Sequence, residues 1–492
     1  MASTTSSSEL EHGAIGLRDV LFQSITAMAP GAAIAASIPA GAAFAGGALP
    51  LAVVVAMVAC LFAASSIGEL ASHLPAAGGV ATYSSRGLHP IVGFLVAWGY
   101  VFVEALVPTL LLLQLGFTTA STVHSEWSSY PATLWWPWAI LGAILIATVA
   151  FFGVKASARF GTILGAFEII VFLILAIFFI VKAGSHNTLS VFGTSHTPKA
   201  YAGISGVIAG SVYTILAFSG FEAAAPLAEE AKDPRRTIRR AIIGATLAIG
   251  VIYIFTTYAA AVLVGPDKFA GFGTEGANSW EGIARASYGL YWVLVFFAII
   301  NSTVANANAG LAVSTRMAFA LGRIGVFPTS FARLHPKHRS PIVGIAVQFV
   351  IAVAATLVLG FAYNPVTAFV LVATIIVIVV VIVYIVVNAA CIGFFLRFER
   401  GHFHWLRHGV VPVLGIIAFV PALLTSAGIP AFSFVTPLTA PISYAGPIVA
   451  VWMVIGVVYL VYLWTRHRSR VVATGLVHLD SEPDQLAEAA ER

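Results

Sequence analysis

The stretch Leu216–Pro226 reads LAFSGFEAAAP and contains three residues that a membrane-spanning helix ordinarily avoids. It lies in an apolar run from about residue 200 to residue 228, which is long enough to cross a bilayer. Gly220 loosens the helix, Glu222 places a carboxyl near mid-span, and Pro226 has no N–H to donate to the carbonyl of Glu222. Unpaired backbone in hydrocarbon costs several kcal/mol per group, so a break here must face protein or a water-filled cavity.

A broken helix with an ionisable group at mid-membrane is typical of a transport site. The alternative interpretation is a proline-kinked structural helix in which Glu222 is protonated and hydrogen-bonded. The residues of this stretch alone favour neither interpretation over the other.

The composition indicates a membrane protein. Of the 492 residues, 59% are hydrophobic and 9% are charged, whereas a soluble protein has about 25% charged residues. We therefore expect a polytopic membrane protein. Cys60 and Cys391 lie in apolar runs and imply neither a disulfide framework nor a metal site, and no cofactor is expected. The first 17 residues lack the basic region of a cleavable signal, so we expect the first span to be retained.

Twelve apolar segments approach the length of about 20 residues that a span requires. The polar segments between them are short and leave no room for a second soluble domain. The tail from Thr465 onward is basic and then acidic, and we expect it to be disordered. The predicted spans are residues 19–46, 49–71, 91–120, 135–153, 160–183, 203–229, 241–264, 287–319, 341–361, 366–396, 409–427 and 445–465.

The distribution of Lys and Arg predicts the orientation of the chain. If the N-terminus is cytoplasmic, 21 of the 25 Lys and Arg residues fall on the cytoplasmic side, and only Lys182, Lys199, Lys268 and Arg285 fall on the other. We therefore expect a cell-membrane protein with both termini in the cytoplasm. The net charge of +5 reflects this topology, so no nucleic-acid partner is expected. The basic segment Arg235–Arg240 is an orientation signal, with membrane lipid as a possible partner.

The first predicted span also contains residues that interrupt a helix, because Thr26–Ala33 reads TAMAPGAA. Pro30 removes the partner of the Thr26 carbonyl, and Gly31 adds conformational freedom, although simple helix flexibility is an alternative explanation. Paired interruptions at corresponding places in two halves are the best sequence indication of an inverted-repeat transporter. We expect an all-α membrane protein with breaks in helices 1 and 6, repeats of five helices over residues 19–183 and 203–396, two further helices over 409–465, and tails over 1–18 and 466–492.

The two breaks predict how a substrate is bound. Freed carbonyls at residues 26–28 and 216–219 can accept from an ammonium group, and N–H groups at residues 31–33, where a half-helix begins, favour a carboxylate. Together they fit a zwitterionic amino acid, whereas carbonyls alone would suit an amine or polyamine. The candidate substrate-binding residues are Thr26, Ala27, Met28, Ala29, Pro30, Gly31, Ala32, Ala33, Leu216, Ala217, Phe218, Ser219, Gly220, Phe221 and Glu222.

Polar residues within the spans are candidates for coupling. Glu104, Glu168 and Glu222 are the proton-coupling candidates, and each could instead be a buried structural hydrogen-bonder. A structural role is favoured for Glu69, which is close to water at the inner end of its span. Asn301 and Asn306 could line the site or hold helices together.

Four motifs, in order over most of residues 19–397, resemble the amino acid–polyamine–organocation superfamily of permeases. The resemblance implies a leucine-transporter-like fold with alternating access, and amino acids, amines or polyamines as substrates. It also implies a central site at the breaks, closed by Phe218 or Phe221, and it matches Glu222 and Glu104 to frequent acidic positions. The motifs are GELASHLPAAGGVATYSSRG (Gly68–Gly87), FSGFEAAAPLAEEAKDPRRTIRRA (Phe218–Ala241), NANAGLAVSTRMAFALGRIGVFPTSFARLHPKHRSP (Asn306–Pro341), and a helix 10 pattern with Tyr384, Asn388 and Arg397.

Two departures from that family affect the expected mechanism. Ala29–Ala33 reads APGAA, where many members carry a glycine-rich G-S-G or G-T-G break. Counted from GVKASAR (Gly153–Arg159), Glu168 stands where some proton-coupled members carry a lysine. Coupling through a lysine therefore does not carry over, and the hypothesis is that Glu168 or Glu222 carries the proton. Proton symport, uniport, exchange and sodium coupling are all compatible with the sequence.

Two other classes of function are disfavoured. All 13 histidines fall in loops, tails or span edges and no Asp lies mid-span, which argues against a membrane enzyme. A channel would need a filter-like motif or a ring of charge, and the sequence has neither. We therefore expect a secondary transporter of amino acids, with amine or polyamine transport as the alternative.

Overall fold

The computed structural model describes residues 16–74, 79–152, 158–223, 225, 234–338 and 340–475. Within these ranges the chain is built of helices and contains no strand. Pro226, residues 153–157, and the two ends of the chain, residues 1–15 and 476–492, lie outside the described residues, as do the predictions that depend on them.

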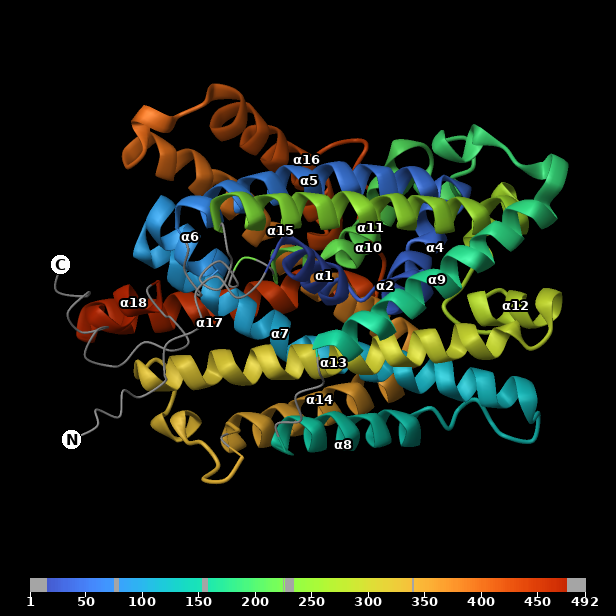
Figure 1. Cartoon of the computed structure of the whole chain (residues 1–492), viewed down its shortest axis with the longest axis horizontal. Coiled ribbons are helices and arrows are strands. Elements are labelled where there is room, and N and C mark those ends of the chain that lie inside the picture. Colours follow the sequence, from blue (N-terminus) through green and yellow to red (C-terminus); the bar gives the residue numbers. More distant parts are fainter. Residues whose placement is uncertain are drawn as a thin grey trace.

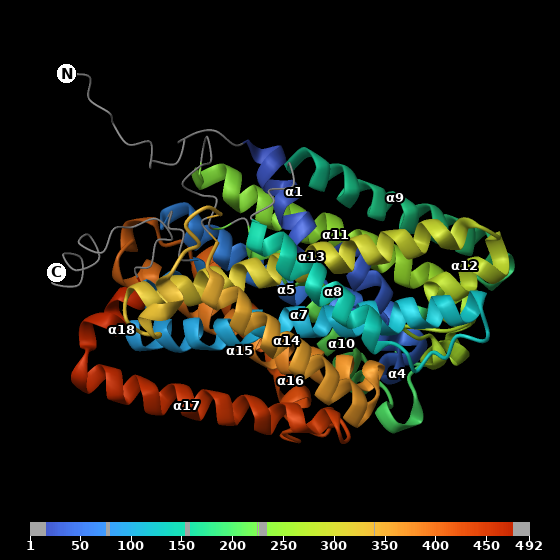
Figure 2. The same ribbon diagram turned by 90° about the horizontal axis from the view of Figure 1, so that it is seen from below.

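Long helices run side by side along the long axis of the molecule (Figure 1 and Figure 2). In the described part of the chain, ten helical segments are long and apolar enough to cross a membrane. The first, Val20–His73, contains the predicted spans 19–46 and 49–71, and the shorter apolar helix Trp136–Phe152 coincides with the predicted span 135–153. The chain is therefore an all-helical, multi-span membrane protein.

The first segment of the bundle is a series of short helices, and most later helices end close to the predicted spans. The short helices are α1 (Leu17–Ala27), α2 (Pro30–Ala32), the π-helix η1 (Ala33–Ser37), α3 (Ile38–Ala40), α4 (Ala42–Ala45) and η2 (Gly46–Ala48). The later helices are α5 (Leu49–His73), α6 (Gly79–Gly87), α7 (Pro90–Glu126), α8 (Trp136–Phe152), α9 (Ala158–Ala183), α10 (Ile204–Phe218), α11 (Pro234–Val264), α12 (Trp280–Tyr288), α13 (Tyr291–Arg323), α14 (Ile342–Tyr363), α15 (Pro365–Arg397), α16 (Val411–Ala427), α17 (Ala445–Arg466) and α18 (Arg468–Thr474).

Several helices differ from the prediction, among them α6, which forms in the segment expected to be a loop between the spans 49–71 and 91–120. The predicted span 287–319 merged the end of α12 with α13, but Gly289 adopts a positive φ of 55° and separates them. α11 begins at Pro234, before the predicted residue 241. The prediction followed the apolar run and therefore missed the first turns of the helix, which contain arginines. α18 forms where we expected a disordered tail, and Arg470 Nη1 donates to the Gly325 carbonyl at 2.8 Å, which holds α18 against the loop that follows α13.

The interrupted segments lie inside the bundle. α5 packs against α10, α11, α15 and α16, and α7 packs against α13, α14 and α15. α1 lies between α11 and α9, whereas α2 and η1 contact α13, α9 and α10. α17 lies at the edge of the bundle (Figure 2). Protein therefore surrounds both interruptions, as the unpaired backbone of a broken helix in a membrane requires.

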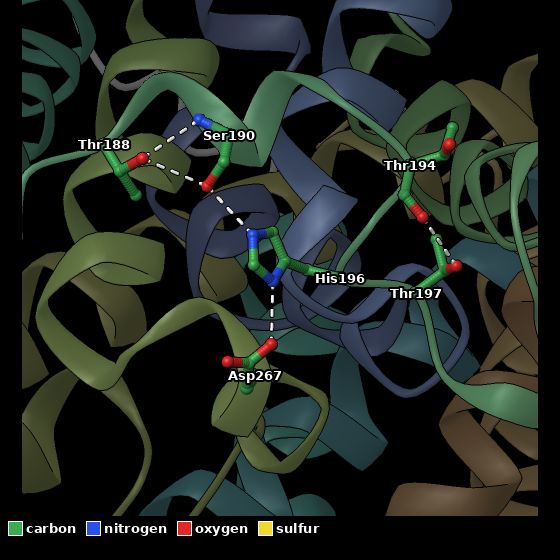
Figure 3. Close-up of polar contacts among 6 residues, drawn as sticks. All are labelled: Thr188, Ser190, Thr194, His196, Thr197 and Asp267. Atoms are coloured by element: carbon green, nitrogen blue, oxygen red, sulfur yellow. Dashed lines mark hydrogen bonds and ion pairs between the residues drawn. The ribbon is translucent and has the colours of Figure 1, made fainter.

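A hydrogen-bonded chain fixes the far end of the first segment (Figure 3). His196 Nε2 lies 2.9 Å from Ser190 Oγ, and its Nδ1 lies 2.7 Å from Asp267 Oδ1 in η7 (Pro266–Gly271). The N–H of Gly47 donates to the His196 carbonyl at 3.0 Å. The Asp267 side chain is 87% exposed, unlike the buried aspartate of a Ser-His-Asp protease, so this chain of contacts joins three surface segments.

Candidate functional site

The first break lies between α1 and α2. Ala29 adopts a left-handed φ of 45°, a conformation that costs an L-residue roughly 1–2 kcal/mol. Pro30 has no N–H for the Thr26 carbonyl, which instead accepts from the N–H of Ala29 at 3.0 Å. The helix is thus interrupted within the predicted stretch, and an alanine takes the conformation for which a glycine would be the usual choice.

The second break follows α10 and lies directly against the first. α10 ends at Phe218, and Gly220 adopts a positive φ of 112°. A Cβ at Gly220 would lie 2.6 Å from the Ala27 carbonyl oxygen, closer than real Cβ contacts come, so the approach of the two breaks requires glycine. Ser24 Oγ donates to the Phe221 carbonyl at 3.0 Å and adds a second link.

Tyr253 of α11 serves both breaks with one hydroxyl. Its O–H donates to the Ala217 carbonyl at 3.0 Å and also reaches the Met28 carbonyl at 3.4 Å. The side chain is fully buried. We did not predict that Tyr253 would join the two breaks. The only sequence signal was its position within an apolar span, where a buried tyrosine hydroxyl normally needs a hydrogen-bond partner.

Glu222 connects the second break to two other helices. Its carboxyl accepts from the hydroxyl of Tyr100 on α7, from the hydroxyl of Tyr384 on α15 at 3.1 Å, and from the N–H of Gly220 at 3.1 Å. The prediction placed Glu222 in the site and Tyr384 in a family motif, but it did not identify Tyr100. A carboxyl with three donors can hold α7, α15 and the end of α10 together.

Glu168 of α9 reaches the first break. Asn301 Nδ2 on α13 donates to Glu168 Oε1, and the Gly31 N–H lies within hydrogen-bonding reach of the same carboxyl. A Cβ at Gly31 would lie 3.2 Å from Glu168 Oε2 and 3.0 Å from the Ser302 Cβ. The structure therefore brings Glu168 and Asn301, two predicted site residues, to the start of the half-helix that begins at Pro30.

The backbone of this half-helix is less free than the sequence indicated. We expected the N–H groups of residues 31–33 to be available to a substrate carboxylate, but the N–H of Ala33 donates to the Ala29 carbonyl at 3.0 Å. The N–H of Gly31 faces the protein's own carboxyl, Glu168. Gln114 Nε2 on α7 holds the Ala32 carbonyl at 3.1 Å. The sequence could not show that groups of the protein on α7 and α9 lie against the same backbone groups that a substrate would use, because this depends on tertiary contacts.

The other predicted polar residues lie at different distances from the breaks. Glu104 is half-buried one turn beyond Tyr100 on α7 and is near enough to Glu222 for their charges to interact. Asn306 is half-buried on α13, more than one turn beyond Asn301. Glu69 on α5 forms an ion pair with Arg239 at 3.1 Å, at the end of the bundle where α11 begins, and does not belong to the site.

Phe218 and Phe221, the two candidates for closing the site, are both fully buried. Phe218 packs edge-on against Tyr253, with ring centroids 5.4 Å apart, and Phe221 lies 5.2 Å from Tyr384. Each ring therefore contacts a tyrosine that hydrogen-bonds to the broken segments.

Two interrupted helices that meet inside a multi-span bundle, with carboxyls at both breaks, define a membrane transporter. The chain belongs to the amino acid permease family, whose model matches residues 19–472. This places it in the amino acid–polyamine–organocation superfamily, as the sequence motifs indicated, and its family is one of permeases and not of enzymes.

Three relatives illustrate the range of substrates in the family. The chain is 28% identical to the branched-chain amino acid permease BcaP of Bacillus subtilis, over 62% of this chain and 66% of that protein. It is 29% identical to the low-affinity putrescine importer PlaP of Escherichia coli, over 63% and 67%, respectively. It is 28% identical to a methylthioribose transporter of Bacillus subtilis, over 60% and 64%. The chain thus spans about two thirds of the length of these relatives.

Gly220→Ala tests the contact between the two breaks. We expect a loss of stability greater than the roughly 1–3 kcal/mol of backbone strain alone, because the new Cβ also meets the Ala27 carbonyl. Thermal unfolding of the purified protein measures this. Gly265→Ala is the matched control, because Gly265 has a φ of 94° and no atom within 4 Å of the position that a Cβ would take. Equal losses in the two variants would contradict the proposed close contact.

Tyr253→Phe tests the shared hydroxyl. Its removal leaves the Ala217 and Met28 carbonyls without this donor, and we expect a loss of about 1–3 kcal/mol in the free energy of unfolding. Tyr83→Phe is the control, because the buried Tyr83 hydroxyl has no hydrogen-bond partner in the described part of the chain. Denaturant unfolding of both variants compares them, and a loss as large for Tyr83→Phe would exclude a special role for Tyr253.

Proposed function

We propose that the chain is a secondary transporter that moves an amino acid together with a proton across the cell membrane, by alternating access around the two breaks. The position of Glu168, beside Gly31 at the start of a half-helix, is the observation that carries this proposal. Family membership supports transport in general, and a branched-chain amino acid permease among the relatives supports an amino acid substrate.

Proton and substrate are coupled in this proposal through competition for one helix end. The start of a helix attracts a negative charge, and the Gly31 N–H is one of the donors there. An ionised Glu168 holds that place and repels a substrate carboxylate. A proton on Glu168 removes the repulsion and releases the Gly31 N–H to the substrate. Binding of a carboxylate substrate is therefore favoured when a proton is bound.

The ammonium group of the substrate is assigned to the second break. The carbonyls of residues 216–219 lie there, and the Ser219 hydroxyl is a buried group with no hydrogen-bond partner among the described residues. An unpartnered polar atom next to a break is suited to a polar ligand, because leaving it unpaired costs free energy. In this proposal the remaining predicted site residues, from Thr26 to Ala33 and from Leu216 to Glu222, belong to the same binding site.

Glu222 is the second candidate for the proton, but its contacts favour a different role. Its carboxyl accepts from the hydroxyls of Tyr100 and Tyr384 and from the N–H of Gly220, and so joins three elements of the protein. We propose that this carboxyl closes the passage between α7 and α15 in the present conformation. Glu104, one turn along α7, lies near enough to Glu222 for the charges of the two carboxyls to interact.

An amine or polyamine is the second candidate substrate, and the same carboxyl supports it. If Glu168 stays ionised, it is a counter-ion for a substrate that carries an ammonium group and no carboxylate. A relative named as a putrescine importer favours this alternative. The two candidate substrates predict opposite effects when the charge of Glu168 is removed: binding of a carboxylate substrate is favoured, whereas binding of an amine without a carboxylate is weakened.

The membrane topology belongs to the same proposal. We propose twelve spans in two inverted repeats of five followed by two further helices, with both termini in the cytoplasm. The basic residues at several helix ends support this arrangement: Arg239 pairs with Glu69, and Arg397 Nη1 donates to the Leu88 carbonyl at 2.8 Å. These contacts gather the end of α5, the starts of α7 and α11 and the end of α15 at one end of the bundle.

Glu168→Gln is the decisive variant. In proteoliposomes without sodium, an inward gradient of about one pH unit supplies about 1.4 kcal/mol per proton and can drive an accumulation of about tenfold. We expect the purified wild-type protein to accumulate a labelled amino acid from a pooled set in this way. Glu168→Gln should still exchange the substrate but should lose the response to the gradient, because the position can no longer gain or lose a proton.

Glu399→Gln is the matched control, because it makes the same change at a residue that pairs with His402 on the surface. Coupling through Glu168 is rejected if Glu168→Gln accumulates substrate as the wild type does, and Glu222→Gln then tests the second candidate. Uptake of labelled putrescine instead of amino acids, abolished by Glu168→Gln, would support the counter-ion alternative.

A further inference from the structure

An arginine-lined hollow of about 520 Å³ opens at the start of α11. Among the described residues, it is lined by Arg236, Arg239, Arg240, Ile243 and Gly244 of α11. Three of these five residues are cationic. None of these residues takes part in the contacts between the two breaks.

Two of the three arginines have charges that the described part of the protein does not neutralise. Arg239 is paired with Glu69 at 3.1 Å. Arg236 and Arg240 are exposed, and neither has an ion pair or hydrogen bond with any of the described residues. A hollow with two guanidinium groups that no described residue pairs with favours an anion, and guanidinium matches phosphate oxygens in geometry as well as in charge.

The same face of α11 continues as an exposed apolar track. Gly244, Leu247 and Val251 follow Arg240 at four, seven and eleven residues, a spacing that keeps them on one helix face. The Leu247 side chain is 48% exposed and that of Val251 is 55% exposed. A ligand with a phosphate at the arginines and a hydrocarbon chain along this track would use both parts of the surface.

α1 packs beside the part of α11 that lines the hollow. Leu21 Cδ1 would lie 3.4 Å from a Cβ on Gly244, and Met28 lies near Tyr253, so α1 and α11 run in the same direction. Arg18 lies one turn before Leu21, as Arg240 lies one turn before Gly244. A third exposed arginine is thus at the level of the hollow, on the helix that leads into the first break.

We propose that this hollow binds an anionic phospholipid, whose phosphate contacts Arg236 and Arg240 and whose acyl chain lies along Leu247 and Val251. The apolar track favours a lipid over a soluble phosphate compound. The site lies at the end of the bundle that the proposed topology places in the cytoplasm, where the anionic lipids of a cell membrane attract basic segments. A lipid in this position contacts both α11 and α1.

Lipid binding to the purified full-length protein tests the proposal. Dioleoylphosphatidylglycerol is titrated in detergent, retained lipid is counted by native mass spectrometry, and dioleoylphosphatidylcholine serves as the neutral comparison. We expect specific retention of phosphatidylglycerol. We expect the double variant Arg236→Gln with Arg240→Gln to bind it about thirtyfold more weakly, at about 1 kcal/mol for each arginine.

Two further variants separate charge from folding. Arg236→Lys with Arg240→Lys should retain most of the affinity, because lysine also binds phosphate as a point charge. Arg466→Gln, an exposed arginine at the end of α17, should leave phosphatidylglycerol binding unchanged. The thermal unfolding temperature of each variant without added lipid verifies that it is folded.

Three results would overturn the proposal. The first is equal retention of phosphatidylcholine and phosphatidylglycerol by the wild-type protein. The second is unchanged phosphatidylglycerol binding in the folded glutamine double variant. The third is displacement of phosphatidylglycerol by an equal concentration of glycerol phosphate, which would assign the hollow to a soluble phosphate compound. None of these readouts depends on transport or on the identity of its substrate.

Discussion

The free-energy cost of unpaired backbone groups in a water-poor interior determines how the two helix breaks are arranged at the centre of this protein. Each interrupted helix leaves carbonyl and N–H groups without their usual partners, and the two breaks resolve this problem jointly. Gly220 lets the second break approach the Ala27 carbonyl, and the Tyr253 hydroxyl is shared between carbonyls from both. The two breaks are consequently one structural unit, held by a third helix that neither of them belongs to.

The two carboxyls at the breaks, Glu222 and Glu168, are held in different ways. Glu222 accepts from two tyrosines and from the N–H of Gly220, and thereby ties the second break to α7 and α15. Glu168 reaches across from α9 to the start of the half-helix at Gly31, where a helix favours a negative charge. The protein thus carries its own carboxyl at the place where the break in the first span led us to expect a substrate carboxylate.

The two halves of the first segment are supported unequally. Beyond the break, α7 holds the Ala32 carbonyl through Gln114, and α12 holds the Ile34 carbonyl through Trp280 Nε1 at 2.8 Å. The contact of Gly47 with His196 fixes the far end of this half. Before the break, α1 packs against α11 and α9. The half beyond the break is therefore hydrogen-bonded to several elements, whereas α1 packs mainly against α11 and α9, is linked to the second break through Ser24, and lies beside the arginine-lined hollow.

The sequence by itself determined that this is a multi-span membrane protein with interruptions near Pro30 and Gly220, because apolar run length, proline and glycine act locally along the chain, and its motifs indicated the permease family. It also indicated the carboxyls at Glu168 and Glu222, since an ionisable residue in a span is rare and conspicuous. Only the tertiary structure decided which groups these residues face. Tyr253 and Tyr100 resemble any other aromatic residue of an apolar span until the helices are packed. The approach of the Glu168 carboxyl to Gly31 joins residues more than 130 positions apart, and no local pattern encodes which helix lies against which.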